Sequence, residues 1–150
     1  MHITKIGLLK EGRKPIDTRT PITPNGCRKL LNAYPELQIF AKDSEFRCFA
    51  KEEYINAGVH VTDDLSGCDI LLGVKEVPVG ELVSGKKYMF FSHTIKKQAH
   101  NRSLLKNILS KNIELIEEGA DTLTLGKEKV DAIWSFGAMH HCFNKTKAFQ

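Results

Sequence analysis

Short runs of apolar, β-branched and aromatic residues recur along the chain, and stretches with helical spacing separate them. Several runs, such as 70–74, are continuously apolar, which is typical of strands buried on both faces of a parallel sheet. We therefore predict an α/β fold: an open, mainly parallel twisted sheet with helices on both faces and right-handed crossovers. The predicted strands are 5–9, 37–41, 59–62, 69–74, 87–91 and 113–116, with a possible further strand at 130–136.

Three segments predict helices. Thr23 is a good N-cap, and Pro24 suits the first helical position of a helix that follows it. A short helix over 51–57 is expected to end at Gly58 in a left-handed cap. The longest predicted helix spans 96–109 and carries one apolar stripe, which we expect to lie in the core. The stripe consists of Leu104, Leu105, Ile108 and Leu109.

Composition and charge exclude several classes of protein. A content of 41% hydrophobic and 27% charged residues is typical of a soluble globular chain of 150 residues. We find no long apolar stretch and no signal peptide, so we expect no membrane span and a cytoplasmic location. The net charge of +4 is spread along the chain, without the dense basic stripe and stacking aromatics that nucleic-acid binding favours.

The four cysteines show no C-x-x-C spacing, and we expect them to be reduced. Cys142 next to His140 and His141 is the one group that suggests a metal. Three neighbouring residues on one segment rarely converge on one ion without further ligands, so we expect no metal site.

The first candidate site residue lies in segment 10–24, which joins the first strand to the first helix and contains three prolines. Arg19 lies just before the helix, where a bidentate guanidinium could hold a substrate carboxylate. The alternative is an arginine that pairs with Glu11 or Asp17 on the surface. The spacing alone favours neither.

Two further candidates follow predicted strands, and ligands of open α/β sheets bind outside the carboxyl ends of the strands. Lys75 is either a charge that reaches solvent or a partly buried ammonium, which would give up its proton more readily and suit proton transfer. His93 leaves an aromatic strand, and a histidine there can act as general acid or base. An isolated histidine is more often structural.

Together these segments resemble the N-terminal domain shared by alanine dehydrogenase, the transhydrogenase and the lysine-forming saccharopine dehydrogenases. The resemblance covers about residues 4–116, and segment 91–98 most resembles the lysine–ketoglutarate reductase branch. The matching elements are Glu11 with Arg19 and Pro21-Ile22-Thr23-Pro24, then Glu53-Tyr54 with Ala57-Gly58, then Val74-Lys75-Glu76 with Pro78, and finally Asn101 with Leu104-Leu105.

The resemblance implies the substrate-side domain of an NAD(P)-dependent amino-acid oxidoreductase. It implies that Arg19, Lys75 and Glu76 bind substrate, and that Lys75 and His93 are the catalytic acid/base pair in imine formation or hydrolysis. The implied ligand is a small amino acid or oxo acid, and a homo-oligomer is possible. The alternatives are an alanine dehydrogenase-type domain, a non-catalytic module that binds such an acid, and a structural remnant.

The expected domain organisation is a substrate domain over 1–118 and a divergent segment over 119–150. No Gly-x-Gly-x-x-Gly follows a predicted strand, so the nucleotide fingerprint is missing. The resemblance implies NAD or NADP as cofactor, yet we expect no nucleotide-binding domain in this sequence. We therefore expect the isolated chain to be inactive as a dehydrogenase.

Overall fold

The structure is a computed structural model that describes residues 3–12, 16–92 and 99–115. These residues belong to one compact unit, residues 1–116. Several predictions fall outside the described residues: His93, the group at 140–142, the strand at 130–136 and the segment 119–150. They stay predictions, as does the domain boundary at residue 118.

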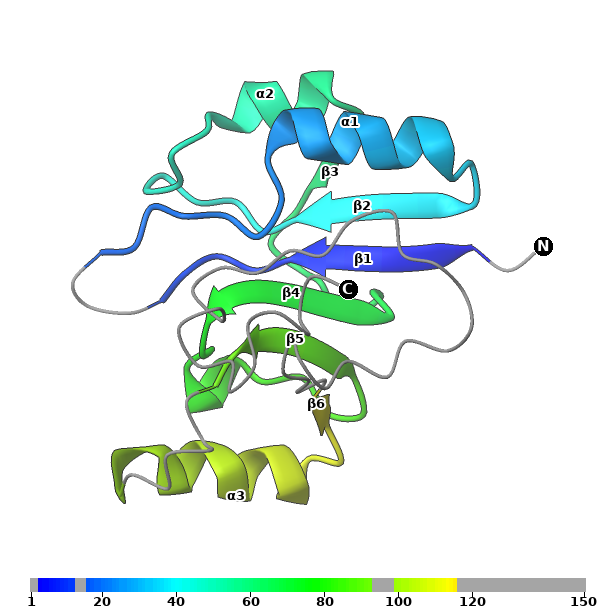
Figure 1. The fold of residues 1–150 in the computed structure, drawn as a ribbon. Coiled ribbons are helices and arrows are strands. Elements are labelled where there is room, and N and C mark those ends of the chain that lie inside the picture. Colours follow the sequence, from blue (N-terminus) through cyan, green and yellow to red (C-terminus); the bar gives the residue numbers. More distant parts are fainter. Residues whose placement is uncertain (1–2, 13–15, 93–98, 116–150) are drawn as a thin grey trace, which may run out of the picture. The chain divides into compact units, whose positions relative to one another are not determined.

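The described unit is built on a six-stranded sheet with the order β3-β2-β1-β4-β5-β6. Every neighbouring pair is parallel, and the arrows of β1, β2, β4 and β5 point the same way in Figure 1. This confirms the predicted parallel α/β sheet. The strands are β1 (Thr4–Leu8), β2 (Leu37–Ala41), β3 (His60–Val61), β4 (Ile70–Lys75), β5 (Lys87–Phe91) and β6 (Glu114–Leu115).

Helices cover both faces of this sheet, as predicted. Successive strand residues point to opposite faces, so Leu8 packs in the cluster with Cys27 and Tyr54, whereas Leu9 packs in the cluster with Leu104 and Ile108. The first cluster lies under α1 and α2, and the second lies under α3. The helices are α1 (Pro24–Ala33), α2 (Lys51–Asn56) and α3 (Arg102–Ser110), with short 3-10 turns η1 (Val79–Glu81) and η3 (Ala99–Asn101).

The two predicted helix caps are confirmed. The side chain of Thr23 accepts a hydrogen bond from the backbone N–H of Gly26, and Pro24 begins α1. Gly58 follows α2 with φ +89°, a backbone conformation that glycine adopts without a steric penalty. Local sequence chemistry therefore sets the start of α1 and the end of α2.

The predicted apolar stripe of the third helix is only half buried. Leu104 and Ile108 are buried, but Leu105 is 43% exposed and Leu109 is 72% exposed, so their assignment to the core was wrong. Each residue of a helix is rotated by about 100° from the last. Consequently one pair spaced by four residues faces the sheet, while the pair shifted by one residue faces outward.

The strand order reverses between β1 and β4. The connection from β1 leads to β2 on one side, and β4 continues to β5 on the other. Leu8 pairs with Leu72, and the N–H of Leu9 donates to the Leu72 carbonyl at 2.8 Å, so the ends of β1 and β4 lie side by side. Such a reversal point is where ligands of open α/β sheets bind.

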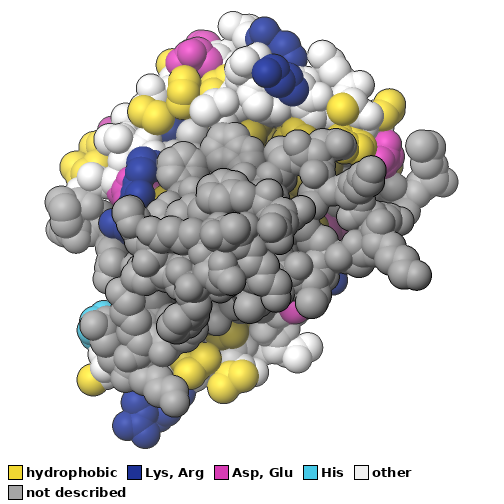
Figure 2. Space-filling model, viewed as in Figure 1, with side chains coloured by type: hydrophobic (Ala, Val, Ile, Leu, Met, Phe, Trp, Pro, Cys, Tyr) yellow, Lys and Arg dark blue, Asp and Glu magenta, His cyan; other side chains and the backbone are white. Residues whose placement is uncertain are grey.

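Figure 2 shows one face of the molecule, with the basic side chains of the described residues in dark blue. Among the described residues they lie in separate places on that face. In the described part of the chain, no helix is long and apolar enough to cross a membrane.

Gly7 in β1 offers a test of the packing between β1 and β4. A Cβ atom at Gly7 would lie 2.6 Å from Leu71 Cδ2 and 3.1 Å from Cys68 Sγ. We expect Gly7→Ala to lower the free energy of unfolding by about 1–3 kcal/mol, because the core must shift to admit the methyl group. Urea denaturation followed by circular dichroism measures this change.

The matched control is Gly67→Ala. A Cβ atom at Gly67 meets nothing within 4 Å, so this variant should be within about 0.5 kcal/mol of wild type. Equal stability of the two variants would contradict the close β1–β4 packing.

Candidate functional site

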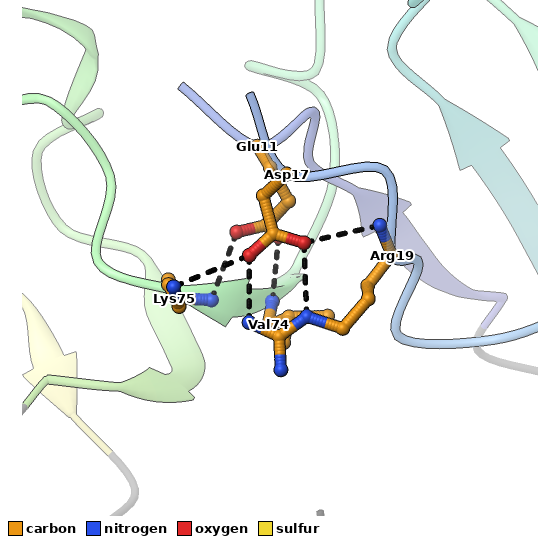
Figure 3. Close-up of polar contacts among 5 residues, drawn as sticks. All are labelled: Glu11, Asp17, Arg19, Val74 and Lys75. Carbon is orange, nitrogen blue, oxygen red and sulfur yellow. Dashed lines mark hydrogen bonds and ion pairs between the residues drawn. The ribbon is translucent and has the colours of Figure 1, made fainter. Parts of the chain in front are cut away.

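Four charged side chains meet at the reversal point of the sheet, and we call them the charged cluster: Glu11, Asp17, Arg19 and Lys75 (Figure 3). Three come from the connection between β1 and α1, and Lys75 is the last residue of β4. Sequence separation between the two parts exceeds 50 residues. The fold, rather than local sequence, brings them together.

Glu11 joins the two strand ends through its carboxylate. One oxygen accepts the backbone N–H of Val74 at 2.7 Å, and the other accepts that of Lys75 at 3.0 Å. Burial raises the pKa of the Glu11 carboxyl, whereas the two backbone hydrogen bonds oppose that rise. Glu11 therefore fixes the chain after β1 against the end of β4.

Asp17 and Arg19 form a bidentate ion pair. Arg19 Nε donates to Asp17 Oδ1 at 2.9 Å and Nη2 donates to Oδ2 at 2.6 Å, while the Arg19 backbone N–H also donates to Oδ1 at 3.1 Å. The hydrogen bonds from the Arg19 side chain hold the pKa of Asp17 well below its ordinary value. Asp17 is therefore a carboxylate throughout the physiological pH range.

Lys75 is the second cation on the same carboxylate. Its Nζ lies 3.4 Å from Asp17 Oδ2, so Asp17 is shared between a guanidinium and an ammonium. The Lys75 side chain is 32% exposed and that of Arg19 is 45% exposed, whereas Asp17 is only 8% exposed. Both cations can reach a ligand in solvent while the carboxylate that holds them is covered.

Residues 17–20 are held by hydrogen bonds within the segment and to the rest of the protein. The Asp17 carboxylate accepts the backbone N–H of Arg19, two residues on, which is the pattern of an Asx-turn. Between them, the carbonyl of Thr18 accepts the N–H of Cys48 at 2.8 Å, and Thr20 is buried against the Tyr54 hydroxyl at 2.8 Å. The segment that carries Asp17 and Arg19 is therefore anchored to the protein through the Thr18 carbonyl and the Thr20 side chain.

The structure brings together two of the four predicted site residues. Arg19 and Lys75 meet through Asp17, and Arg19 makes the surface ion pair that was the alternative to a substrate contact. Glu76 follows β4 directly and is half-buried, with one carboxylate oxygen out of solvent. His93 lies outside the described residues. Roles in binding and catalysis stay predictions for all four.

Asp17 was missed as the centre of the site. Its spacing of two from Arg19 was the available signal, because an aspartate side chain commonly hydrogen-bonds the backbone two residues on. From sequence, Asp17 was expected only as a surface partner of Arg19.

The charged cluster has no net charge of its own, and it can still hold a small anion. Arg19 uses Nε and Nη2 on Asp17, while Nη1 points away from that carboxylate in Figure 3. Arg19 and Lys75 therefore offer neighbouring donors suited to a carboxylate or a carbonyl oxygen. In residues 3–12, 16–92 and 99–115, no three His, Cys, Asp or Glu side chains are placed to hold a metal.

The connection after β1 does not fit a dinucleotide. Dinucleotide sites use a tight glycine turn that leads straight into a helix, whose first N–H groups meet the pyrophosphate. Here β1 ends at Leu8 and α1 begins only at Pro24, which has no N–H. The N–H of Gly26 is already bound to Thr23. The strand order is that of a dinucleotide-binding sheet, but the chemistry of this connection is not.

A shallow hollow also lies at the other end of the sheet, lined by residues 85–87 and 112–114 at the amino ends of β5 and β6. It contains no member of the charged cluster. Ligands of parallel sheets bind at the carboxyl ends, so the cluster is the stronger candidate site.

Several known proteins are similar to this chain in sequence. Alpha-aminoadipic semialdehyde synthase of Arabidopsis thaliana is 34% identical over 116 residues, which cover 75% of this chain and 11% of that protein. The mitochondrial enzyme of that name from Bos taurus is also 34% identical, covering 77% and 12%. Saccharopine dehydrogenase [NAD(+), L-lysine-forming] of Yarrowia lipolytica is 26% identical, covering 69% and 29%.

Solved structures show the same fold. An L-alanine dehydrogenase superposes with a TM-score of 0.62 at 20% identity, covering 75% of this chain and 32% of that one. A transhydrogenase from Sinorhizobium meliloti superposes with a TM-score of 0.61 at 16% identity, covering 74% and 33%. The chain thus spans about a third of these structures and about a tenth of the semialdehyde synthases.

The described fold and the family comparison agree on one assignment. Residues 7–137 match the family described as the alanine dehydrogenase/PNT N-terminal domain, and the match covers most of the 150 residues. The chain belongs to the alanine dehydrogenase/PNT N-terminal domain family.

Proposed function

We propose that the charged cluster binds the carboxylate of a small amino acid or oxo acid, and that this domain is the substrate side of an NAD(P)-dependent amino-acid oxidoreductase. The observation that carries the proposal is the meeting of Arg19 and Lys75 on the shared carboxylate of Asp17, at the reversal point of the sheet. Two exposed cations held by a covered carboxylate form a binding surface that is positioned before the ligand arrives.

Asp17 occupies the face of Arg19 that a substrate carboxylate would also favour. An incoming carboxylate can bind at Nη1 beside Asp17, or displace Asp17 from the bidentate position. Lys75 Nζ, at 3.4 Å, remains a partner for Asp17 in either case. The cluster can therefore accept a second carboxylate without leaving Asp17 unpaired, which would be costly for a covered charge.

Lys75 is proposed to contact the oxygen or nitrogen of the substrate's carbonyl or imine group. An ammonium beside a carbonyl oxygen stabilises the negative charge that develops when an amine or water adds. Formation of an imine also requires protons to be moved. His93 is proposed as the partner acid/base, and Glu76 as a further substrate contact; both rest on the family resemblance.

Within the family, the lysine–ketoglutarate reductase type is the proposed branch. The semialdehyde synthases and the Yarrowia saccharopine dehydrogenase support it by sequence. An alanine dehydrogenase-type domain is the alternative supported by fold. NAD or NADP as cofactor and a homo-oligomer stay predictions. So does a cytoplasmic location, whereas the name of the Bos taurus relative carries the word mitochondrial.

A lysine substitution tests the site directly. We expect Lys75→Met to weaken binding of 2-oxoglutarate by about 10–100-fold, because it removes one charge-assisted hydrogen bond to the ligand. Isothermal titration calorimetry with 2-oxoglutarate, and with pyruvate in parallel, measures the effect and ranks the two branches.

The matched control is Lys87→Met. Lys87 is also paired to a carboxylate, Glu114 at 3.3 Å, but it lies at the start of β5, at the opposite end of the sheet. This variant should bind as wild type does. Equal binding by Lys75→Met and wild type would refute the cluster as the substrate site and leave a structural role.

A second prediction concerns turnover. We expect the isolated chain not to oxidise NADH or NADPH with lysine plus 2-oxoglutarate, or with pyruvate plus ammonia, because the connection from β1 to α1 does not fit a dinucleotide. Absorbance at 340 nm reports the reaction. Oxidation above the rate without protein would show that this sequence holds a complete active site.

A further inference from the structure

Two adjacent residues in the connection between β2 and α2 contact the segment that carries Glu11, Asp17 and Arg19. They contact it at two points, Leu9 and Thr18. Arg47 Nη2 donates to the carbonyl of Leu9 at 3.0 Å, and the N–H of Cys48 donates to the carbonyl of Thr18 at 2.8 Å. Leu9 precedes Glu11 by two residues, and Thr18 lies between Asp17 and Arg19. One short stretch therefore ties the end of β1 to the segment that holds the ion pair.

Arg47 is itself held in place by Tyr54. The Arg47 guanidinium carbon lies 5.2 Å from the centre of the Tyr54 ring, within the range of a cation–π contact. Tyr54 is buried, and its hydroxyl lies 2.8 Å from Thr20 Oγ1 and 3.0 Å from the Ile22 carbonyl. The aromatic residue that orients Arg47 also anchors the residue next to Arg19.

These contacts suit an arginine and no shorter side chain. A guanidinium is planar, so it can lie over a ring and still donate in its own plane to a carbonyl. The carbonyl of Leu9 lies just past the last paired residue of β1, where the connection leaves the sheet. Removal of the guanidinium would leave this part-buried carbonyl without that donor.

We propose that Arg47 is a positioning residue for carboxylate binding: it holds the end of β1 against the stretch whose next residue, Cys48, binds Thr18, and it thereby sets where Asp17 and Arg19 lie relative to Glu11 and Lys75. Its consequence for substrate rests on the proposed function, whereas its effect on the geometry of the cluster does not. Arg47 acts through the cluster and is not itself placed on the substrate.

The geometry of the cluster has a reporter that needs no substrate, the titration of the Asp17 carboxyl. Arg19 and Lys75 face it as cations, and Glu11 faces it as an acid. In wild type the hydrogen bonds from Arg19 keep the Asp17 pKa well below the ordinary value. The Arg19 bonds lie within one segment and persist if that segment moves, whereas Lys75, which also lowers the Asp17 pKa, comes from the end of β4. If the segment moves away from β4, the Lys75 contact loosens and the Asp17 pKa rises.

The experiment compares Arg47→Met, Arg47→Gln and Arg47→Lys in the full chain. Carbon-13 NMR follows the Asp17 carboxyl across acid pH, and calorimetry follows binding of 2-oxoglutarate. Met retains packing on Tyr54 but has no donor. Gln retains a donor, on a side chain too short to reach the Leu9 carbonyl, and Lys retains the charge with a single point of contact. Arg28→Met is the matched control, because Arg28 also donates to a backbone carbonyl, that of Asn56 at 3.3 Å, away from the cluster.

We expect Arg47→Met and Arg47→Gln to raise the Asp17 pKa and to weaken 2-oxoglutarate binding on the order of tenfold. Arg47→Lys should restore part of both effects, and Arg28→Met should change neither. An Asp17 titration that matches wild type in either Met or Gln variant, or an equal rise in Arg28→Met, would overturn the proposal. If wild type does not bind 2-oxoglutarate, the proposed function fails, and the Asp17 titration still decides the role of Arg47.

Discussion

The carboxylate of Glu11 is the contact on which the site depends. Pairing between β1 and β4 ends at Leu8 and Leu72, yet β4 continues to Lys75. Backbone N–H groups must find acceptors when strands are partly buried. Beyond the last paired residues, the Glu11 carboxylate supplies the acceptors for the N–H groups of Val74 and Lys75. The connection from β1 is thereby held where its other charges meet Lys75.

The balance of charge around Asp17 explains how a site can be organised without a ligand. Two cations near each other would repel, and a shared anion removes that repulsion. The arrangement also keeps both cations exposed, since the covered partner is Asp17. Arg47, outside the charged cluster, is proposed to position the segment that carries Asp17 and Arg19. The binding surface is thus supported from the sheet on one side and from the connection before α2 on the other.

The sequence was informative where local chemistry decides the outcome. Apolar runs predict the parallel sheet, Thr23 and Gly58 predict two caps, and strand ends predict Arg19 and Lys75 as candidates. Contacts across long separations were not predictable: Glu11 binds residues 63 and 64 positions away. The exposure of Leu105 and Leu109 depends on how α3 is rotated on the sheet, which spacing alone leaves open by one residue.

The most direct test of the central claim is where an oxo acid binds on the domain. Titration of the nitrogen-15-labelled chain with 2-oxoglutarate, followed by NMR, reports each backbone N–H and the Arg19 Nε–H. We predict the largest changes at Arg19 Nε and at the N–H groups of Val74 and Lys75, where Glu11 joins β1 to β4. Changes confined to residues 85–87 and 112–114, at the opposite end of the sheet, would contradict it.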